Sequence, residues 1–237
     1  MAFKIIMTSP YPQMTRTIRQ VSNELGLSVT VVEDTMSSAA SKVAELVQNE
    51  EFEVVVSRAG TANKIIEQVD LPIVHCDNSD FDIMQAFIKA KKLGDRIGFL
   101  TYPEEAFPYK MKTVSEVIGF EVKQLPYKNW EDIMEQIQFA SESGIEVIVG
   151  GGRRAFQKIQ EIGMKVMPIM TSERIIRRTL IRASELATYR IAEREKKGKL
   201  NAVIHSSEQG IIIVNKHNKI ETFNVAAESM FGIKAGD

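Results

Sequence analysis

The sequence predicts an α/β fold of two tandem, similar lobes, each with a four-stranded parallel sheet between two layers of helices. Short β-branched apolar runs alternate with helical stretches along most of the chain, which is typical of βαβ units. The chain also repeats itself at an offset of 93 residues, and a fixed internal period indicates two copies of one unit. Matched pairs include Thr8 and Thr101, Pro10 and Pro103, Gly26 and Gly119, residues 53–56 and 146–149, and Ser79 and Ser172.

The first repeat contains four apolar runs short enough to be strands, at residues 3–7, 29–33, 53–56 and 73–75. Helices are expected between them and after them, at residues 14–24, 37–49, 62–69 and 80–93. Gly26 follows the first helix, where glycine commonly ends a helix. Ser79 directly precedes the last helix and is a suitable N-cap.

The second repeat predicts strands at residues 97–100, 122–125, 147–149 and 166–167, with helices at 104–118, 130–141 and 155–162. Gly119 and Gly144 follow helices, as Gly26 does. Because residues 80–93 carry the chain into the second lobe, we expect the matched helix 173–186 to pack back on the first lobe.

A long helix is expected from residue 173 to about residue 197. Its apolar stripe is Ile176, Leu180, Ala183, Ala187 and Ile191, a spacing that fits either docking on a lobe or pairing with a second subunit. Residues 194–199 are almost wholly charged. They are either a solvated helix end or a connector that carries the state of the lobes to the following unit. The expected domains are a lobe with its crossover helix at 3–93, a second lobe at 94–170, this helix at 171–199, and a further unit at 200–237.

Composition excludes several classes of protein. With 30 basic and 31 acidic residues among 237, no net field favours nucleic acid or an anionic membrane. No run of 18 apolar residues and no signal-peptide pattern occurs, so a cytoplasmic location without membrane contact is expected. The single Cys excludes an internal disulfide and a cysteine-based zinc site.

Residues 200–237 form a separate unit, in which a helix is followed by Gly210, a strand at 211–215, a polar turn at 216–219, a strand at 220–223 and a helix at 226–231. This order of elements looks like the opening of a PAS domain. A PAS domain needs about 100 residues to close its sheet, so we expect the sequence to be a piece of a longer protein.

Five motifs follow one another along the chain: Ser-Arg-Ala-Gly-Thr-Ala at residues 57–62, Leu-Pro-Ile-Val at 71–74, Ser-Asp-Phe-Asp at 79–82, Val-Ile-Val-Gly-Gly-Gly at 147–152 and Thr-Ser-Glu at 171–173. In this order they resemble the N-terminal sensor of the propionate-catabolism activators, the PrpR-type family of sigma-54-dependent bacterial regulators. The resemblance covers residues 3 to about 190. It implies two similar parallel α/β lobes, commonly followed by a PAS domain, an AAA+ ATPase and a helix-turn-helix. The best-known members respond to 2-methylcitrate, a small tricarboxylate.

The resemblance implies that the full-length protein contacts DNA and sigma-54 RNA polymerase and hydrolyses ATP. Those activities would lie beyond residue 237, because no P-loop motif and no basic recognition helix occur here. For this region we expect a homodimer that binds a small anionic metabolite between its lobes, with no cofactor, no metal and no catalysis.

Two loops at the carboxyl ends of matched strands are the main candidate ligand-binding segments, Ser57-Arg58-Ala59-Gly60-Thr61 and Gly150-Gly151-Gly152-Arg153. Each opens a helix, whose first N–H groups favour anions, and ligands of parallel sheets bind at the carboxyl ends of the strands. Arg58 adds a planar donor for carboxylate or phosphate. The alternative is that the glycines only make the turns and the arginines face solvent.

Hydroxyl groups follow the first strand of each repeat at Thr8, Ser9, Thr101 and Tyr102, and they either bind the ligand or cap helices. Thr171 and Ser172 are expected to be caps. Cys76 is expected to be structural, since two-lobed racemases use one Cys per lobe and its repeat partner is Ile169. A racemase- or chelatase-like enzyme and a purely structural dimerisation module remain as alternatives to the sensor.

Overall fold

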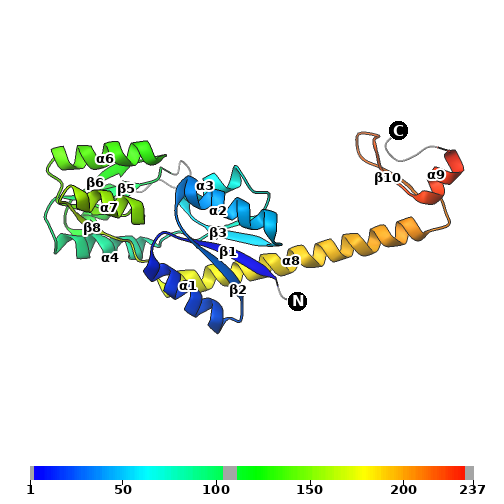
Figure 1. Ribbon diagram of the computed structural model, residues 1–237, viewed down its shortest axis with the longest axis horizontal. Coiled ribbons are helices and arrows are strands. Elements are labelled where there is room, and N and C mark those ends of the chain that lie inside the picture. The colour runs from blue at the N-terminus through cyan, green and yellow to red at the C-terminus, as the bar shows by residue number, and fades with distance from the viewer. Residues whose placement is uncertain (1–2, 104–110, 233–237) are drawn as a thin grey trace. The chain divides into compact units, whose positions relative to one another are not determined.

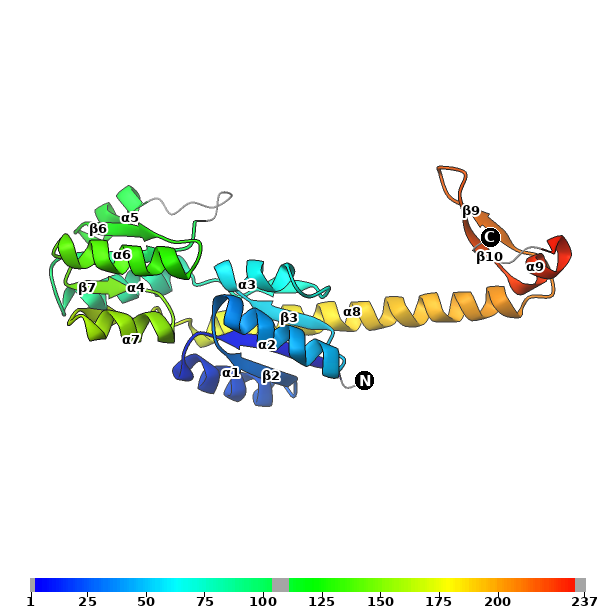
Figure 2. The same ribbon diagram turned by 45° about the horizontal axis from the view of Figure 1, so that its top comes forward.

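The computed structural model describes residues 3–103 and 111–232. Two compact units are formed, Met1–Ala187 and Thr188–Asp237. The first unit contains both predicted lobes (Figures 1 and 2). The finer division at residues 93, 170 and 199 stays a prediction.

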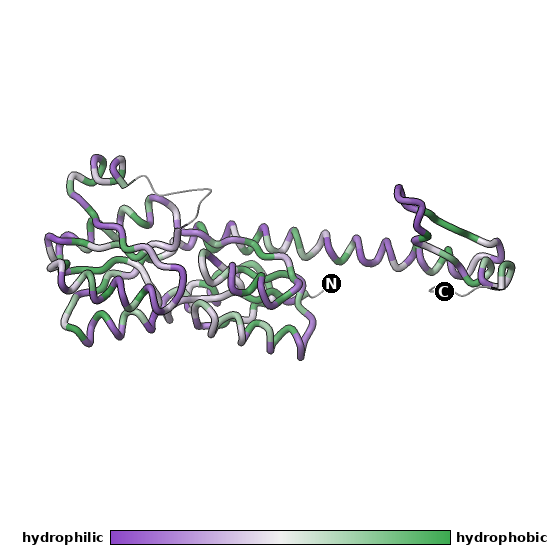
Figure 3. Tube along the Cα trace, turned by 90° about the horizontal axis from the view of Figure 1, so that it is seen from above, coloured by the Kyte–Doolittle hydropathy of each residue, from purple (hydrophilic) through white to green (hydrophobic). Residues whose placement is uncertain are grey.

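Lobe 1 is a four-stranded parallel sheet in the order β2-β1-β3-β4. Alternate residues of β1 enter two separate cores, because side chains along a strand point to opposite faces: Ile5 and Met7 pack on one face and Ile6 on the other. Figure 3 shows hydrophobic stretches alternating with hydrophilic ones along the chain trace. The elements are β1 Lys4–Ser9, α1 Pro12–Glu24, β2 Ser28–Glu33, α2 Met36–Asn49, β3 Val54–Ser57, α3 Ala59–Ile66 and β4 Ile73–His75.

Lobe 2 repeats this plan, with strand order β6-β5-β7-β8 and all neighbours parallel. Its helices again cover both faces of the sheet. The elements are β5 Ile97–Thr101, α5 Met111–Ile118, β6 Val122–Pro126, α6 Trp130–Glu142, β7 Val147–Val149, α7 Arg153–Glu161 and β8 Lys165–Met167. The first part of the expected helix 104–118, residues 104–110, lies outside the described residues.

Each lobe is completed by a helix that directly follows the other lobe in the sequence, and we call it the closing helix of the lobe it packs on. Helix α4 (Asp80–Lys91) follows lobe 1 in sequence but packs in lobe 2, where Phe87 meets Phe99 edge-on at 5.1 Å between ring centroids. Helix α8 (Glu173–Ser206) returns to lobe 1, and its Ile176 and Leu180 are fully buried against β1 and β3. The prediction that 173–186 packs back on lobe 1 is confirmed.

The registers of the paired strands show the duplication, and they also show that the first strand of lobe 2 is shifted by one residue relative to the ungapped repeat. Val55 lies opposite Ile73 in lobe 1, and Ile148 lies opposite Val166 in lobe 2, so these strands match at the offset of 93. The first strand of each lobe differs, because Ser9 lies opposite Glu33 whereas Thr101 lies opposite Pro126. Thr101 therefore occupies the position of Ser9, not that of Thr8 as the ungapped repeat predicts.

Two helix boundaries differ from the sequence-based prediction. Helix α3 begins at Ala59, three residues before the expected start, because Arg58 has the extended backbone of an N-cap. Helix α8 continues through Gly198 to Ser206, so the boundary expected near residue 197 is not a helix end. No helix among the described residues has both the length and the apolar character needed to cross a membrane.

The second unit holds a short antiparallel pair, β9 (Ile212–Val214) and β10 (Ile220–Phe223), followed by α9 (Val225–Phe231). Buried Asn224 organises it: the side-chain oxygen accepts from the N–H groups of Ile211 and Ala227, and the amide donates to the carbonyls of Ile204 and Gln209. The predicted order of elements is present. Its identification as the start of a PAS domain stays a prediction.

Candidate ligand-binding site

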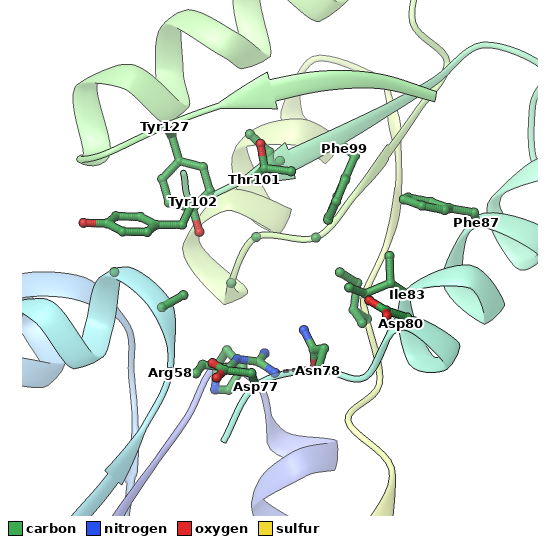
Figure 4. A pocket seen from close by; sticks show the side chains of 18 of the residues that line it. Arg58, Asp77, Asn78, Asp80, Ile83, Phe87, Phe99, Thr101, Tyr102 and Tyr127 are labelled. Atoms are coloured by element: carbon green, nitrogen blue, oxygen red, sulfur yellow. Dashed lines mark hydrogen bonds between the residues drawn. The ribbon is translucent and has the colours of Figure 1, made fainter. Parts of the chain in front are cut away.

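A cavity of about 790 Å³ lies between the two lobes. Its wall is formed at the carboxyl ends of both sheets, as Figure 4 shows from close by. The volume is in the range of sites that enclose a whole small molecule, about 300–1,000 Å³. Lobe 1 and its crossover contribute Pro10, Thr35, Met36, Arg58, Ala59, Gly60, Thr61, Asp77 and Asn78; α4 contributes Asp80, Ile83, Met84 and Phe87; lobe 2 contributes Phe99, Leu100, Thr101, Tyr102, Met111, Thr113, Val114, Val117, Tyr127, Ile133, Gly150, Gly151, Gly152 and Ile169.

Arg58 is the basic side chain of this wall. Its Nη1 donates to Asn78 Oδ1 and to Thr171 Oγ1, each at 2.7 Å. These partners are neutral, and Arg58 forms no ion pair with any described residue. A half-buried guanidinium without a carboxylate partner favours an anion beside it.

Asn78 and Thr171 are partners in the internal repeat, and they meet each other. The Thr171 hydroxyl donates to Asn78 Oδ1 at 2.8 Å across a sequence separation of 93 residues. Asn78 precedes α4 and Thr171 precedes α8. The hydrogen bond therefore joins the two segments that cross between the lobes, at equivalent positions of the repeat. The predicted capping role of Thr171 is thus replaced by contacts to Arg58 and Asn78, while Ser172 lies 3.4 Å from the buried carboxylate of Asp82.

Three helices begin at the cavity, and none of their N-cap residues caps them with a side chain. These residues are Thr35 for α2, Arg58 for α3 and Gly152 for α7. Helices α4 and α6, by contrast, have side-chain caps from Ser79 and Asn129. The first N–H group of α2 donates to Thr61 Oγ1, and that of α7 donates to the Pro10 carbonyl. The three helix starts still place partial positive charge beside the cavity, an arrangement that stabilises anions.

The backbone at these helix starts is unusual. Met36 and Ala59 have φ of 55° and 43°, values that residues with a Cβ seldom adopt. Gly150 and Gly151 have φ of 87° and 89°, so glycine suits the loop after β7. Strained backbone of this kind is concentrated at binding sites, where the surrounding structure holds it in place.

Two glycines mark close contacts between the lobes. A Cβ on Gly60 would lie 2.5 Å from the Tyr102 ring, and one on Gly152 would lie 2.9 Å from the Thr35 side chain. Each pair joins lobe 1 to lobe 2. The lobes are therefore closed on each other beside the cavity, and a Cβ at either position would require the facing side chain or the lobe to shift.

Two tyrosines of lobe 2 form the side of the cavity opposite Arg58 (Figure 4). Tyr102 and Tyr127 meet edge-to-face with ring centroids 5.9 Å apart. Burial raises the pKa of the Tyr127 phenol above its usual value, and the nearby Arg58 charge opposes this only partly. Tyr127 therefore stays protonated at neutral pH and can donate a hydrogen bond to a ligand.

The structure brings nine of the thirteen sequence-predicted residues to the cavity, namely Arg58, Ala59, Gly60, Thr61, Thr101, Tyr102, Gly150, Gly151 and Gly152. The other four do not line it. Thr8 and Ser57 share a buried hydrogen bond of 2.8 Å, and the Ser9 hydroxyl donates to the Tyr11 carbonyl. Arg153 is exposed and lies 3.5 Å from Glu33. Ligand binding by any of the thirteen stays a prediction.

Sequence reasoning missed Thr35, Asn78 and Tyr127, which line the cavity. Thr35 and Tyr127 follow the second strand of their lobes, and Asn78 follows the fourth strand of lobe 1. The rule that ligands bind at the carboxyl ends of parallel strands applies to these strands too and would have found them.

Comparison with known proteins agrees with this architecture. The family model described as propionate catabolism activator matches residues 23–193. The chain belongs to the propionate catabolism activator family. A solved NtrC-family transcriptional regulator from Clostridium acetobutylicum has the same fold, with a TM-score of 0.71 and 20% identity over 80% of this chain and 99% of that one.

Two other structures are more distant. A LacI transcriptional regulator from a Rhodococcus species has a TM-score of 0.47 and 11% identity over 79% of this chain and 91% of its own. An aspartate racemase homologue from Pyrococcus horikoshii has a TM-score of 0.31 and 15% identity over 78% of this chain and 100% of its own. Likenesses this weak identify no function, and the family itself is one of regulators.

Cys76 has the environment of a structural residue in this member of the family. Its side chain is 1% exposed and lies in the lobe 1 core between the sheet and α8. Burial is the main cause that raises the pKa of its thiol, so the nucleophilic thiolate is scarce at neutral pH. It is absent from the cavity wall, where its repeat partner Ile169 is found.

We expect Cys76→Ala to leave ligand affinity unchanged within twofold and to lower the free energy of unfolding by about 1 kcal/mol through lost packing. Calorimetry and denaturant titration measure the two effects. The native thiol should resist alkylation by iodoacetamide at pH 7 and react once the chain is unfolded. Rapid alkylation of the native protein would contradict the structural role.

Proposed function

We propose that this region is a sensor that binds a small anionic metabolite in the cavity between its lobes and has no catalytic activity. The observation that carries the proposal is Arg58, a cation without an ion-pair partner among the described residues, beside three helix N-termini whose own N-cap residues provide no side-chain cap. A carboxylate or phosphate would pair with the Arg58 charge and be favoured by the partial positive charge at these helix starts.

Arg58 also offers a route from ligand to output. Its guanidinium holds Asn78 and Thr171, the residues that lead into α4 and α8. An anion that binds Arg58 in the closed arrangement would shift the population toward closure, because only differential affinity for two states changes their ratio. The change would pass along α8 to the proposed PAS domain, and beyond it to an ATPase and a DNA-binding domain.

The proposal also includes a homodimer in the cytoplasm. The stripe residues Ile176, Leu180, Ala183 and Ala187 are buried in lobe 1, so subunit pairing would use other surfaces. Light scattering tests it: a chain that stays monomeric at high micromolar concentration contradicts the dimer.

We expect Arg58→Ala to weaken binding of the anion by about 2 kcal/mol, about thirtyfold, because charge-assisted hydrogen bonds are lost. Thermal-shift screening of organic acids and phosphate esters identifies a ligand, and calorimetry then gives its affinity. Arg58→Lys should lose less, since the charge stays while the planar donor is removed.

Arg153→Ala is the matched control, because this arginine also follows a strand of the sheet but faces solvent. Its affinity should equal that of the wild type. Equal affinities for wild type and Arg58→Ala, with both folded, would show that the anion binds elsewhere.

A further inference from the structure

The two ends of the interlobe cavity differ in polarity. At one end lie Arg58, Asn78 and the helix starts at Ala59 and Gly152, which present hydrogen-bond donors. At the other end the wall comes from α4, β5 and α5 and is mostly apolar, with Asp80, Thr101 and Thr113 as its polar residues. Figure 4 shows Ile83, Phe87 and Phe99 on the side of the cavity away from Arg58, with the Asp80 carboxylate next to Ile83.

The apolar end is large enough to enclose a substantial group. Its wall includes Ile83, Met84, Phe99 and Val114. Helix α5, which contributes Val114, has no fully buried residue, so its apolar face has surface left to cover. An acid of two or three carbons would reach Arg58 and leave this end of an approximately 790 Å³ cavity untouched.

The charges of the wall limit the ligand further. Among the described lining residues Arg58 is basic, whereas Asp77 and Asp80 are acidic. One anionic group can pair with Arg58, but a second or third would lie near carboxylates without a further basic side chain in the described wall. Both hydrogen bonds of Arg58 use Nη1, which leaves another edge of the guanidinium for a planar carboxylate.

We propose that the effector is a monocarboxylate with an aromatic or branched apolar body. This inference rests on the proposed function and specifies the chemical class of the ligand. The carboxylate lies against Arg58 and the start of α3, and the body occupies the end formed by Met84 and Val114. This class differs from the small tricarboxylate that the family resemblance implies.

The test compares phenylacetate with acetate, citrate and phenyl phosphate on the whole chain by calorimetry. Phenylacetate is expected to bind at least tenfold more tightly than each of the others, because it alone combines one planar charge with a buried ring. If citrate or phenyl phosphate bound more tightly than phenylacetate, this inference would be wrong, whereas the proposal of an anion sensor would still hold. If none of the four binds, this inference fails, and the anion sensor is decided by the wider screen of organic acids and phosphate esters.

Variants at the apolar end separate the ring from the charge. Met84→Ser and Val114→Ser should each weaken phenylacetate about tenfold and leave the affinity for acetate unchanged. Ile88→Ser is the control, since Ile88 is on the same helix as Met84, 49% exposed and outside the cavity wall. Equal phenylacetate affinities for Met84→Ser, Val114→Ser and Ile88→Ser would show that the body does not bind at this end.

Discussion

Leu180→Asp is expected to unfold lobe 1, lowering the free energy of unfolding by about 4 kcal/mol or more. The side chain is fully buried between α8 and the sheet, so the change removes a large apolar group and places a carboxylate without a partner in the core. Denaturant titration followed by circular dichroism measures the loss. Trp130, the one tryptophan of the chain, lies in lobe 2 and reports separately on that lobe by fluorescence.

Ile181→Asp is the matched control one residue further along α8, where the side chain is 39% exposed. It should change stability by no more than about 0.5 kcal/mol. If Leu180→Asp were as stable as Ile181→Asp, α8 would not be the closing helix of lobe 1.

Gly60→Ala is expected to force the lobes apart and to weaken ligand binding at least tenfold. The added Cβ would lie 2.5 Å from the Tyr102 ring, and overpacking of this kind typically costs about 1–3 kcal/mol. Small-angle scattering should show a larger radius of gyration for the lobes, and calorimetry should show the lower affinity. Replacing Tyr102 by Ala in the same chain removes the obstacle and should restore closure.

Gly98→Ala distinguishes lobe opening from general destabilisation. Its Cβ would lie 2.7 Å from Leu125, a clash within lobe 2 and away from the lobe contact. We expect a less stable protein with wild-type affinity. An unchanged scattering profile and affinity in Gly60→Ala would contradict a closed lobe contact at this glycine.

The sequence was sufficient to predict both lobes and the exchange of closing helices, because the repeat and the apolar periodicity act over many residues. Single positions were harder. The ungapped repeat paired Thr8 with Thr101, whereas strand register pairs Thr101 with Ser9, since a one-residue slip changes few identities but turns a side chain to the other face.

Residues of the candidate site could be predicted where the residue type indicates its role at the end of a strand. Arg58 can pair with an anion, and the glycines allow positive φ or a close approach of the backbone. Ser57 shows why the rest was not: it also ends a strand, but its hydroxyl is satisfied by Thr8 inside the lobe. Asn78 and Thr171 were missed as a pair because nothing in the sequence shows that the two crossover segments touch. That contact depends on how the duplicated halves are assembled.

The exchange of closing helices has a consequence for the order of folding during synthesis. Lobe 2 with its closing helix is one continuous stretch of chain, from α4 to β8, whereas lobe 1 combines β1–β4 with the first part of α8. A ribosome releases β1–β4 first, and α1 packs on the sheet face that α8 completes, so the part of this face that α8 covers stays exposed until α8 has emerged. We expect the N-terminal lobe to be completed last, so nascent chains would expose the Ile5 and Met7 face to chaperones while the lobe made later is already folded.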